Sequence, residues 1–132
     1  MTMKPIDYYE ISEQKEFLKN VHRLVKKKRF VSLPGQLMDL EEALSRGEFS
    51  GELLSHGDEP EPYDLYKLRL PNPDANAGKS DGYRVIYLVV TEEKIVVLLT
   101  IYYKKEQEDV TDTYVMGLID GYFMGSLPYD DA

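Results

Sequence analysis

Three basic side chains lie inside stretches of sequence that have the alternating pattern of β-strands. Lys67 and Arg69 occur in the run Tyr-Lys-Leu-Arg-Leu, and Arg84 occurs in the run Gly-Tyr-Arg-Val-Ile-Tyr. Alternate residues of a strand point to opposite faces of a sheet, so Lys67 and Arg69 share one face. Guanidinium groups bind phosphate oxygens in pairs, and ammonium groups supply compact positive charge. The three side chains are therefore candidates for a phosphate-binding site.

The strand that contains Arg84 is followed by a very short turn and another strand, so the two form a hairpin. A two-residue turn places Arg84 on the face that also carries Tyr103 and Lys105. A shift of one residue in the register would replace them with Tyr102 and Lys104. We predict the first register. The expected catalytic cluster is then Lys67, Arg69, Arg84, Tyr103 and Lys105.

Such a cluster suits the cleavage of RNA by its own 2′-hydroxyl group. This reaction needs a stabilised oxyanion, a group that removes a proton and a group that donates one. Clustered cations stabilise the oxyanion and lower one another's pKa values, and a tyrosine ring can stack on a base. No metal or other cofactor is required. The alternative is that these cations are solvated charges that protect a sheet edge or pair with carboxylates, as is common on exposed sheet faces.

The rest of the chain supplies the elements that must position these residues. Strands are expected at about 6–11, 63–70, 82–91 and 94–104, and helices at about 13–28, from Pro34 to Gly47, and after Asp109. The acidic segment 51–62 contains two glycines and two prolines and predicts a loop, and residues 125–132 predict a frayed tail. Strands grouped apart from helices indicate an α+β fold, with an N-terminal strand and a helical pair packed on an antiparallel sheet and a C-terminal helix.

Length and composition narrow the class of protein. The 132 residues suit one domain, no apolar run is long enough to span a bilayer, and there is no cysteine. These features fit a cytoplasmic protein, and the two histidines, His22 and His56, have no metal-binding spacing. The net charge is −8, but residues 66–105 carry seven basic and four acidic groups, whereas 106–132 carry seven acidic groups and none that is basic. The strand-rich half is locally basic despite the total.

Read together, the three strand runs resemble the RelE-like toxins of the RelE/ParE superfamily. Residues 79–87, KSDGYRVIY, are similar to the family version K-S-G-G-Y-R-V-I-Y, and the final strand ends in IYYKKE, similar to I-Y-x-K-x-E. The resemblance implies a curved antiparallel sheet and a metal-independent, ribosome-dependent mRNA endoribonuclease of a type II toxin–antitoxin pair. It also implies an antitoxin and ribosome-bound mRNA as partners, with Lys67, Arg69, Arg84 and Lys105 at the basic positions of the family. Two alternatives remain open: a toxin-fold binding protein without cleavage, and a ParE-like gyrase inhibitor.

Overall fold

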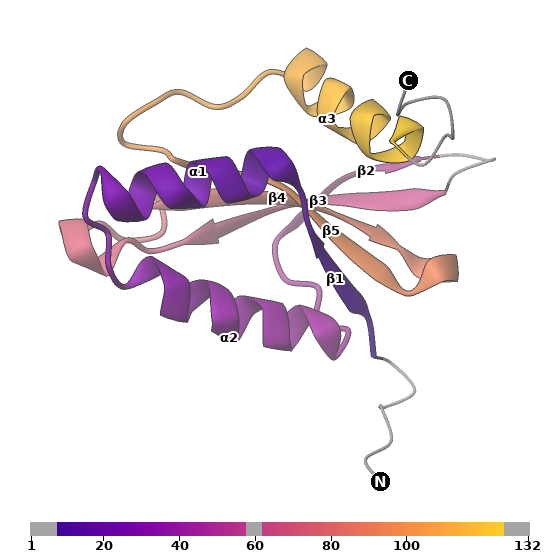
Figure 1. The fold of residues 1–132 in the computed structure, drawn as a ribbon, viewed down its shortest axis with the longest axis horizontal. Helices are drawn as coiled ribbons and strands as arrows, with labels where there is room; N and C mark the ends of the chain where they lie inside the picture. Colours follow the sequence, from indigo (N-terminus) through magenta and orange to yellow (C-terminus); the bar gives the residue numbers. More distant parts are fainter. Residues whose placement is uncertain (1–7, 58–61, 126–132) are drawn as a thin grey trace, which may run out of the picture.

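A computed structural model of the chain describes residues 8–57 and 62–125, which form a five-stranded sheet flanked by three helices (Figure 1). The elements are β1 Glu10–Glu13, α1 Lys15–Lys26, α2 Leu33–Ser45, β2 Glu52–Gly57, β3 Tyr63–Leu70, β4 Tyr83–Val90, β5 Ile95–Tyr103 and α3 Asp112–Met124. Two short 3₁₀ turns, η1 Pro73–Ala75 and η2 Thr91–Glu93, precede β4 and β5. The predicted α+β class is confirmed, as is the C-terminal helix.

The strands lie in the order β1-β5-β4-β3-β2. The pairs β2–β3, β3–β4 and β4–β5 are antiparallel, whereas β1 runs parallel to β5, so the sheet is mixed. The sheet separates α2 on one side from α3 on the other (Figure 1). None of the helices in the described residues is long and apolar enough to cross a bilayer.

Two predictions about single elements were wrong. The expected loop at 51–62 contains β2, which pairs with β3 along the sheet edge and has a bulge between Leu53 and Ser55. Its side chains are mostly exposed, so no burial pattern marks it in the sequence, and its backbone hydrogen bonds to β3 hold it. The first strand occupies Glu10–Glu13 instead of ending at residue 11, and helix α1 begins after Gln14. Residues 6, 7, 58–61 and 126–132 lie outside the described part of the chain.

Each face of the sheet has its own apolar core. On the α2 face, apolar side chains of α1 and α2 such as Phe17, Leu24 and Leu40 pack against Tyr87 and Leu98. The opposite side, called here the α3 face, packs Val115 and Ile119 against other β4 and β5 side chains, including Leu88 and Leu99. Helix α3 covers only part of its face. The remainder holds the candidate site.

A bulge in β5 decides which residues reach the α3 face beyond the middle of the strand. Near the turn, Tyr87 lies opposite Leu98, but the next pair is Ile86 with Thr100, so Leu99 is an extra residue in β5. Beyond it, Arg84 lies opposite Tyr102. The insertion exchanges the two faces for every later residue of the strand.

Candidate functional site

The sheet brings three of the predicted cations to one surface. In the β3–β4 ladder Lys67 lies opposite Ile86, and Arg69 lies directly opposite Arg84. Directly opposed residues share a face, so all three side chains point to the α3 face. The three residues share one face of the sheet; their convergence on one site and their role in chemistry stay predictions.

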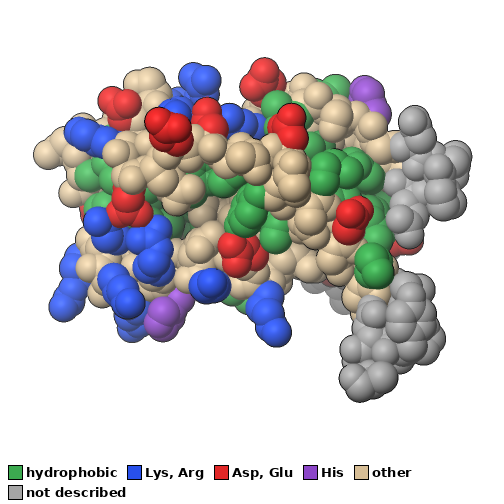
Figure 2. Space-filling model, turned by 90° about the horizontal axis from the view of Figure 1, so that it is seen from above, with side chains coloured by type: hydrophobic (Ala, Val, Ile, Leu, Met, Phe, Trp, Pro, Cys, Tyr) green, Lys and Arg blue, Asp and Glu red, His purple; other side chains and the backbone are tan. Residues whose placement is uncertain are grey.

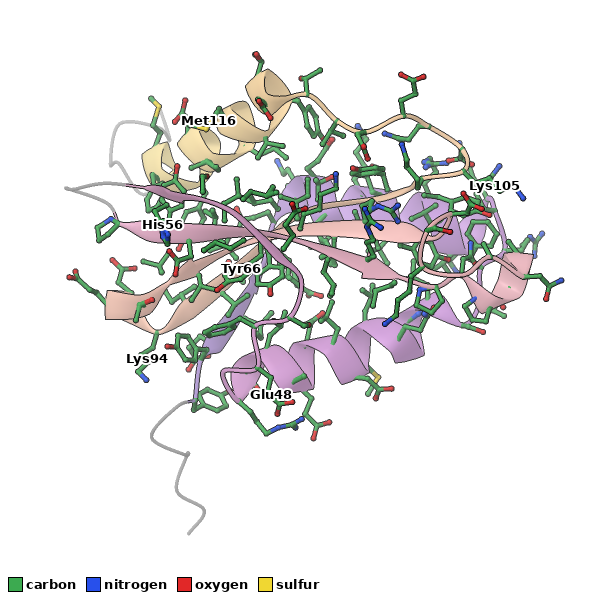
Figure 3. The ribbon with its side chains drawn as sticks, turned by 180° about the vertical axis from the view of Figure 1, so that it is seen from behind. Glu48, His56, Tyr66, Lys94, Lys105 and Met116 are labelled. Carbon is green, nitrogen blue, oxygen red and sulfur yellow. The ribbon has the colours of Figure 1, made fainter. Side chains whose placement is uncertain are left out.

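The other two predicted members lie elsewhere, because the predicted register fails at the bulge. The Tyr103 ring is buried on the α2 face, with its centroid 5.2 Å from that of Phe30 and 5.8 Å from that of Tyr83. Lys105 is exposed and lies beyond the end of β5 (Figure 3). Tyr102 and Lys104 take their places.

Arg84 is buried, with 3% of its surface exposed, and its guanidinium binds backbone. One terminal nitrogen donates to the carbonyl oxygens of Lys79 at 2.8 Å and Tyr83 at 3.3 Å, and the other donates to that of Ser80 at 2.7 Å. These bonds hold the turn before β4 against the strand. Arg84 therefore stabilises the turn before β4, a role that the sequence pattern did not show. Arg69, which lies opposite Arg84 in the ladder, is exposed.

A carboxylate of the chain itself binds Lys67, one member of the cation cluster, together with the nearby Lys104. The Tyr102 hydroxyl donates to Asp109 Oδ1 at 2.8 Å, and the Asp109 oxygens lie 3.4 Å from Lys67 Nζ and 3.5 Å from Lys104 Nζ. The hydrogen bond from Tyr102, followed by the two ammonium groups, holds the pKa of Asp109 below its usual range despite partial burial. An ionised carboxylate thus sits where two lysines and a hydroxyl converge. Sequence analysis missed this residue because it belongs to the acidic C-terminal block, whose contacts have no local signal.

Asp109 belongs to a segment, residues 104–111, that connects β5 to α3 and is called the strap below. The strap is fixed at a second point by Glu106, whose oxygens lie 2.8 Å from an Arg23 terminal nitrogen and 2.7 Å from Lys28 Nζ. Burial opposes ionisation of Glu106, but hydrogen bonds from Lys28 and Arg23 outweigh it and hold the pKa of Glu106 below its ordinary value. Two carboxylates, three residues apart, each bind two cations.

A polar cavity of about 390 Å³ lies between α1, β5, the strap and the start of α3. A chain of hydrogen bonds lines it. The Tyr114 hydroxyl donates to Glu16, and its oxygen atom lies 3.5 Å from Thr100 Oγ1. The side-chain amide of Asn20 donates to the same Oγ1 at 3.0 Å. Burial, followed by the bond to Glu16, raises the pKa of Tyr114. Tyr102 and Asp109 also line the cavity, so it adjoins the cation cluster.

Basic side chains also gather along α1 on the molecular surface (Figure 2). The exposed members are Lys15, Lys19, His22, Lys26, Lys27, Lys28 and Arg29. Among the described residues, no group of three or more His, Cys, Asp or Glu side chains is arranged to hold a metal ion. The chemistry of the site is that of cations, hydroxyls and two bound carboxylates.

Fold and site together define a small α+β protein with basic side chains gathered on one face of its sheet, two of which bind a carboxylate of the chain itself. No family model matches the chain, and no curated protein matches it. Comparison with solved structures finds the E. coli toxin RelE, as a double arginine mutant in the free state, at 24% identity and a TM-score of 0.48 over 76% of this chain and 88% of that one. The isolated E. coli RelE toxin matches at 20% identity and a TM-score of 0.46, covering 85% of this chain and 97% of that one. The archaeal RelE–RelB complex from Pyrococcus horikoshii matches at 24% identity and a TM-score of 0.42, covering 76% and 99%. These are RelE toxins, the group that the strand motifs of this chain resemble.

Proposed function

We propose that this protein is the RelE-like toxin of a type II toxin–antitoxin pair and cleaves mRNA on the ribosome without a metal. The observation that carries the proposal is the convergence of Lys67, Lys104 and the Tyr102 hydroxyl on one carboxylate. A phosphate carries the same kind of charge and acceptor oxygens as that carboxylate, so a scissile phosphate fits the same three groups. The resemblance of the strand motifs names the reaction.

We propose the following roles for the residues of the site. Lys67 and the exposed Arg69 bind the non-bridging phosphate oxygens and stabilise the charge that develops on them. The 2′-hydroxyl loses its proton to solvent water as its oxygen attacks phosphorus, the bond to the 5′-oxygen breaks, and the leaving oxygen takes a proton. Lys104 replaces Lys105 as the candidate donor of that proton, and Tyr102 replaces Tyr103 as the residue that orients the RNA. Arg84 shapes the site from beneath.

The experiment is induced expression, with growth and mRNA cleavage as readouts. Lys67→Ala and Lys104→Ala are expected to relieve growth arrest and to remove cleavage products that end in a 2′,3′-cyclic phosphate. The matched control is Lys94→Asn, because Lys94 lies at the opposite end of the molecule from Lys105 (Figure 3) and its left-handed backbone, φ 57°, accepts Asn. Wild-type expression without growth arrest or mRNA cleavage would count against the proposal.

A specific observation also favours the second candidate, a toxin-fold protein that binds partners without cutting RNA. The chain's own groups engage most of the cluster: Asp109 binds two lysines, and Arg84 binds backbone carbonyls. In both cases the proposed partner is an antitoxin, tested by co-purification with the product of the neighbouring gene. Cleavage products separate the two candidates, and a gyrase assay detects the ParE-like activity.

A further inference from the structure

Two of the three carboxylates of the strap each contact a pair of cations. Asp109 binds Lys67 of β3 and Lys104, whereas Glu106 binds Arg23 and Lys28 at the C-terminal end of α1. Three residues of extended chain span at most about 10 Å, so the two sites are neighbours. This is the scale of one or two nucleotide steps in a single strand of RNA.

The cations in these sites come from elements that are distant in sequence. Arg23 lies in the last turn of α1 and Lys28 two residues after its end, Lys67 lies in the middle of β3, and the strap that joins them follows the last strand. None of the four ion pairs is fully buried: the side chains of Lys67 and Lys104 are 22% and 33% exposed, and those of Arg23 and Lys28 are 36% and 42% exposed. Partly exposed pairs of this kind contribute modest free energies, so a polyanion can replace the carboxylates.

We infer that the strap is an internal substitute for the RNA backbone, and that Arg23 and Lys28 form a second phosphate site in line with the one at Lys67 and Lys104. This inference rests on the proposed function, to which it adds the route of the substrate. RNA that binds across both sites displaces Glu106 and Asp109 together. The free protein is therefore held in a closed state by its own carboxylates.

The strap offers its own matched control. Glu108 lies between the two bound carboxylates and is exposed, and it takes part in none of the ion pairs found among the described residues. Changing it to Gln alters the net charge of the strap by the same amount as Glu106→Gln or Asp109→Asn. Any difference among the three variants then reports on the occupied cation sites and not on charge alone.

The test measures binding of a short, fluorescently labelled 2′-O-methyl RNA to the full chain by anisotropy. This RNA lacks the attacking hydroxyl, so binding is read without cleavage. Glu106→Gln and Asp109→Asn are each expected to tighten binding about fivefold, and Glu108→Gln less than about twofold. Equal effects of all three variants, or no effect of the first two, would overturn the inference.

A measurement on the wild-type chain makes the result independent of the variants' stability. Backbone amide signals of residues 106–111 are expected to shift during titration with the same RNA, together with those of Arg23 and Lys67. Signals of the strap that stay in place while the RNA binds would refute displacement. Failure of the proposed function looks different: ribosomes and mRNA give no cleavage, while the variants still differ in affinity.

Discussion

Arg84 tests how the site is supported, because its guanidinium group donates only to backbone carbonyl oxygens among the hydrogen bonds found in the described residues. Replacing it with alanine removes three hydrogen bonds to the carbonyl oxygens of Lys79, Ser80 and Tyr83. A hydrogen bond from a charged donor contributes about 1.5–3 kcal/mol. Lys79 and Ser80 are exposed, so water replaces part of this loss. We expect the free energy of unfolding to fall by about 3 kcal/mol, a large share of the roughly 5–15 kcal/mol that stabilises a typical domain.

The assay is urea unfolding followed by circular dichroism, and the chain supplies a matched control. Arg69 lies directly opposite Arg84 in the ladder but is exposed, so Arg69→Ala is expected to change stability by less than about 0.5 kcal/mol. The free energy of unfolding falls by about 1–3 kcal/mol per molar urea in small proteins, so Arg84→Ala is expected to lower the unfolding midpoint by about 1–3 M urea. If both variants unfold at the same midpoint, the guanidinium does not brace the turn. If the midpoints differ as expected, loss of cleavage in Arg84→Ala would report on the support of the turn before β4 and not on a role of Arg84 in the reaction.

Three further predictions concern other parts of the molecule. Burial, followed by a hydrogen bond and repulsion from a carboxylate on β1, raises the pKa of Glu41 to about 8, above an ordinary value of 4.5. The stability that Glu41 contributes is therefore fully present below pH 4.5 and is lost as pH rises through 8. Between pH 5 and 9 the free energy of unfolding of the wild type, measured by urea titration, should fall by ~1–2 kcal/mol more than that of Glu41→Gln. Equal losses would refute the pairing of Glu41 with Glu13. Gly82→Ala should cost ~2–3 kcal/mol because its new carbon would lie 2.0 Å from a carbonyl oxygen of β3, while Gly78→Ala, with nothing within 4 Å, should be neutral by thermal melts. Tyr102→Phe removes the first cause of the lowered pKa of Asp109, so NMR titration of that carboxyl should show its pKa rising; an unchanged value would contradict the geometry.

The regular elements followed from sequence because burial imposes periodicity on them. Strands β3, β4 and β5 and the three helices all carry apolar residues at the spacing that their cores require. Strand β2 carries no such signal, since Leu53, Leu54 and His56 are all exposed on an edge strand. Glycine and proline in the same segment then predict a loop. Pairing with β3, which is a property of the folded chain, makes it a strand.

The candidate site was predictable only as far as local pattern reaches. Alternation within one strand places Lys67 and Arg69 together, and a ladder without irregularity places Arg84 beside them. The extra residue Leu99 could not be foreseen, because it lies in an apolar run, Ile95–Leu99, whose side chains suit either face of the sheet. Asp109 lies beyond the reach of local patterns altogether, since its partners Lys67 and Tyr102 come from other parts of the chain.

The bulge in β5 has a consequence for how relatives of this chain should be aligned. Tyr102-Tyr103 end β5 and Lys104-Lys105 follow it. A ladder without the bulge, in which Leu99 paired with Ile86, would exchange the members of each doublet and still present one phenol and one ammonium to the same surface. A slip of one residue in this ladder therefore keeps the chemical type of each side chain on the surface, although the individual positions trade places. Homologous positions in this strand are better matched by the side of the sheet they occupy than by their number along the chain.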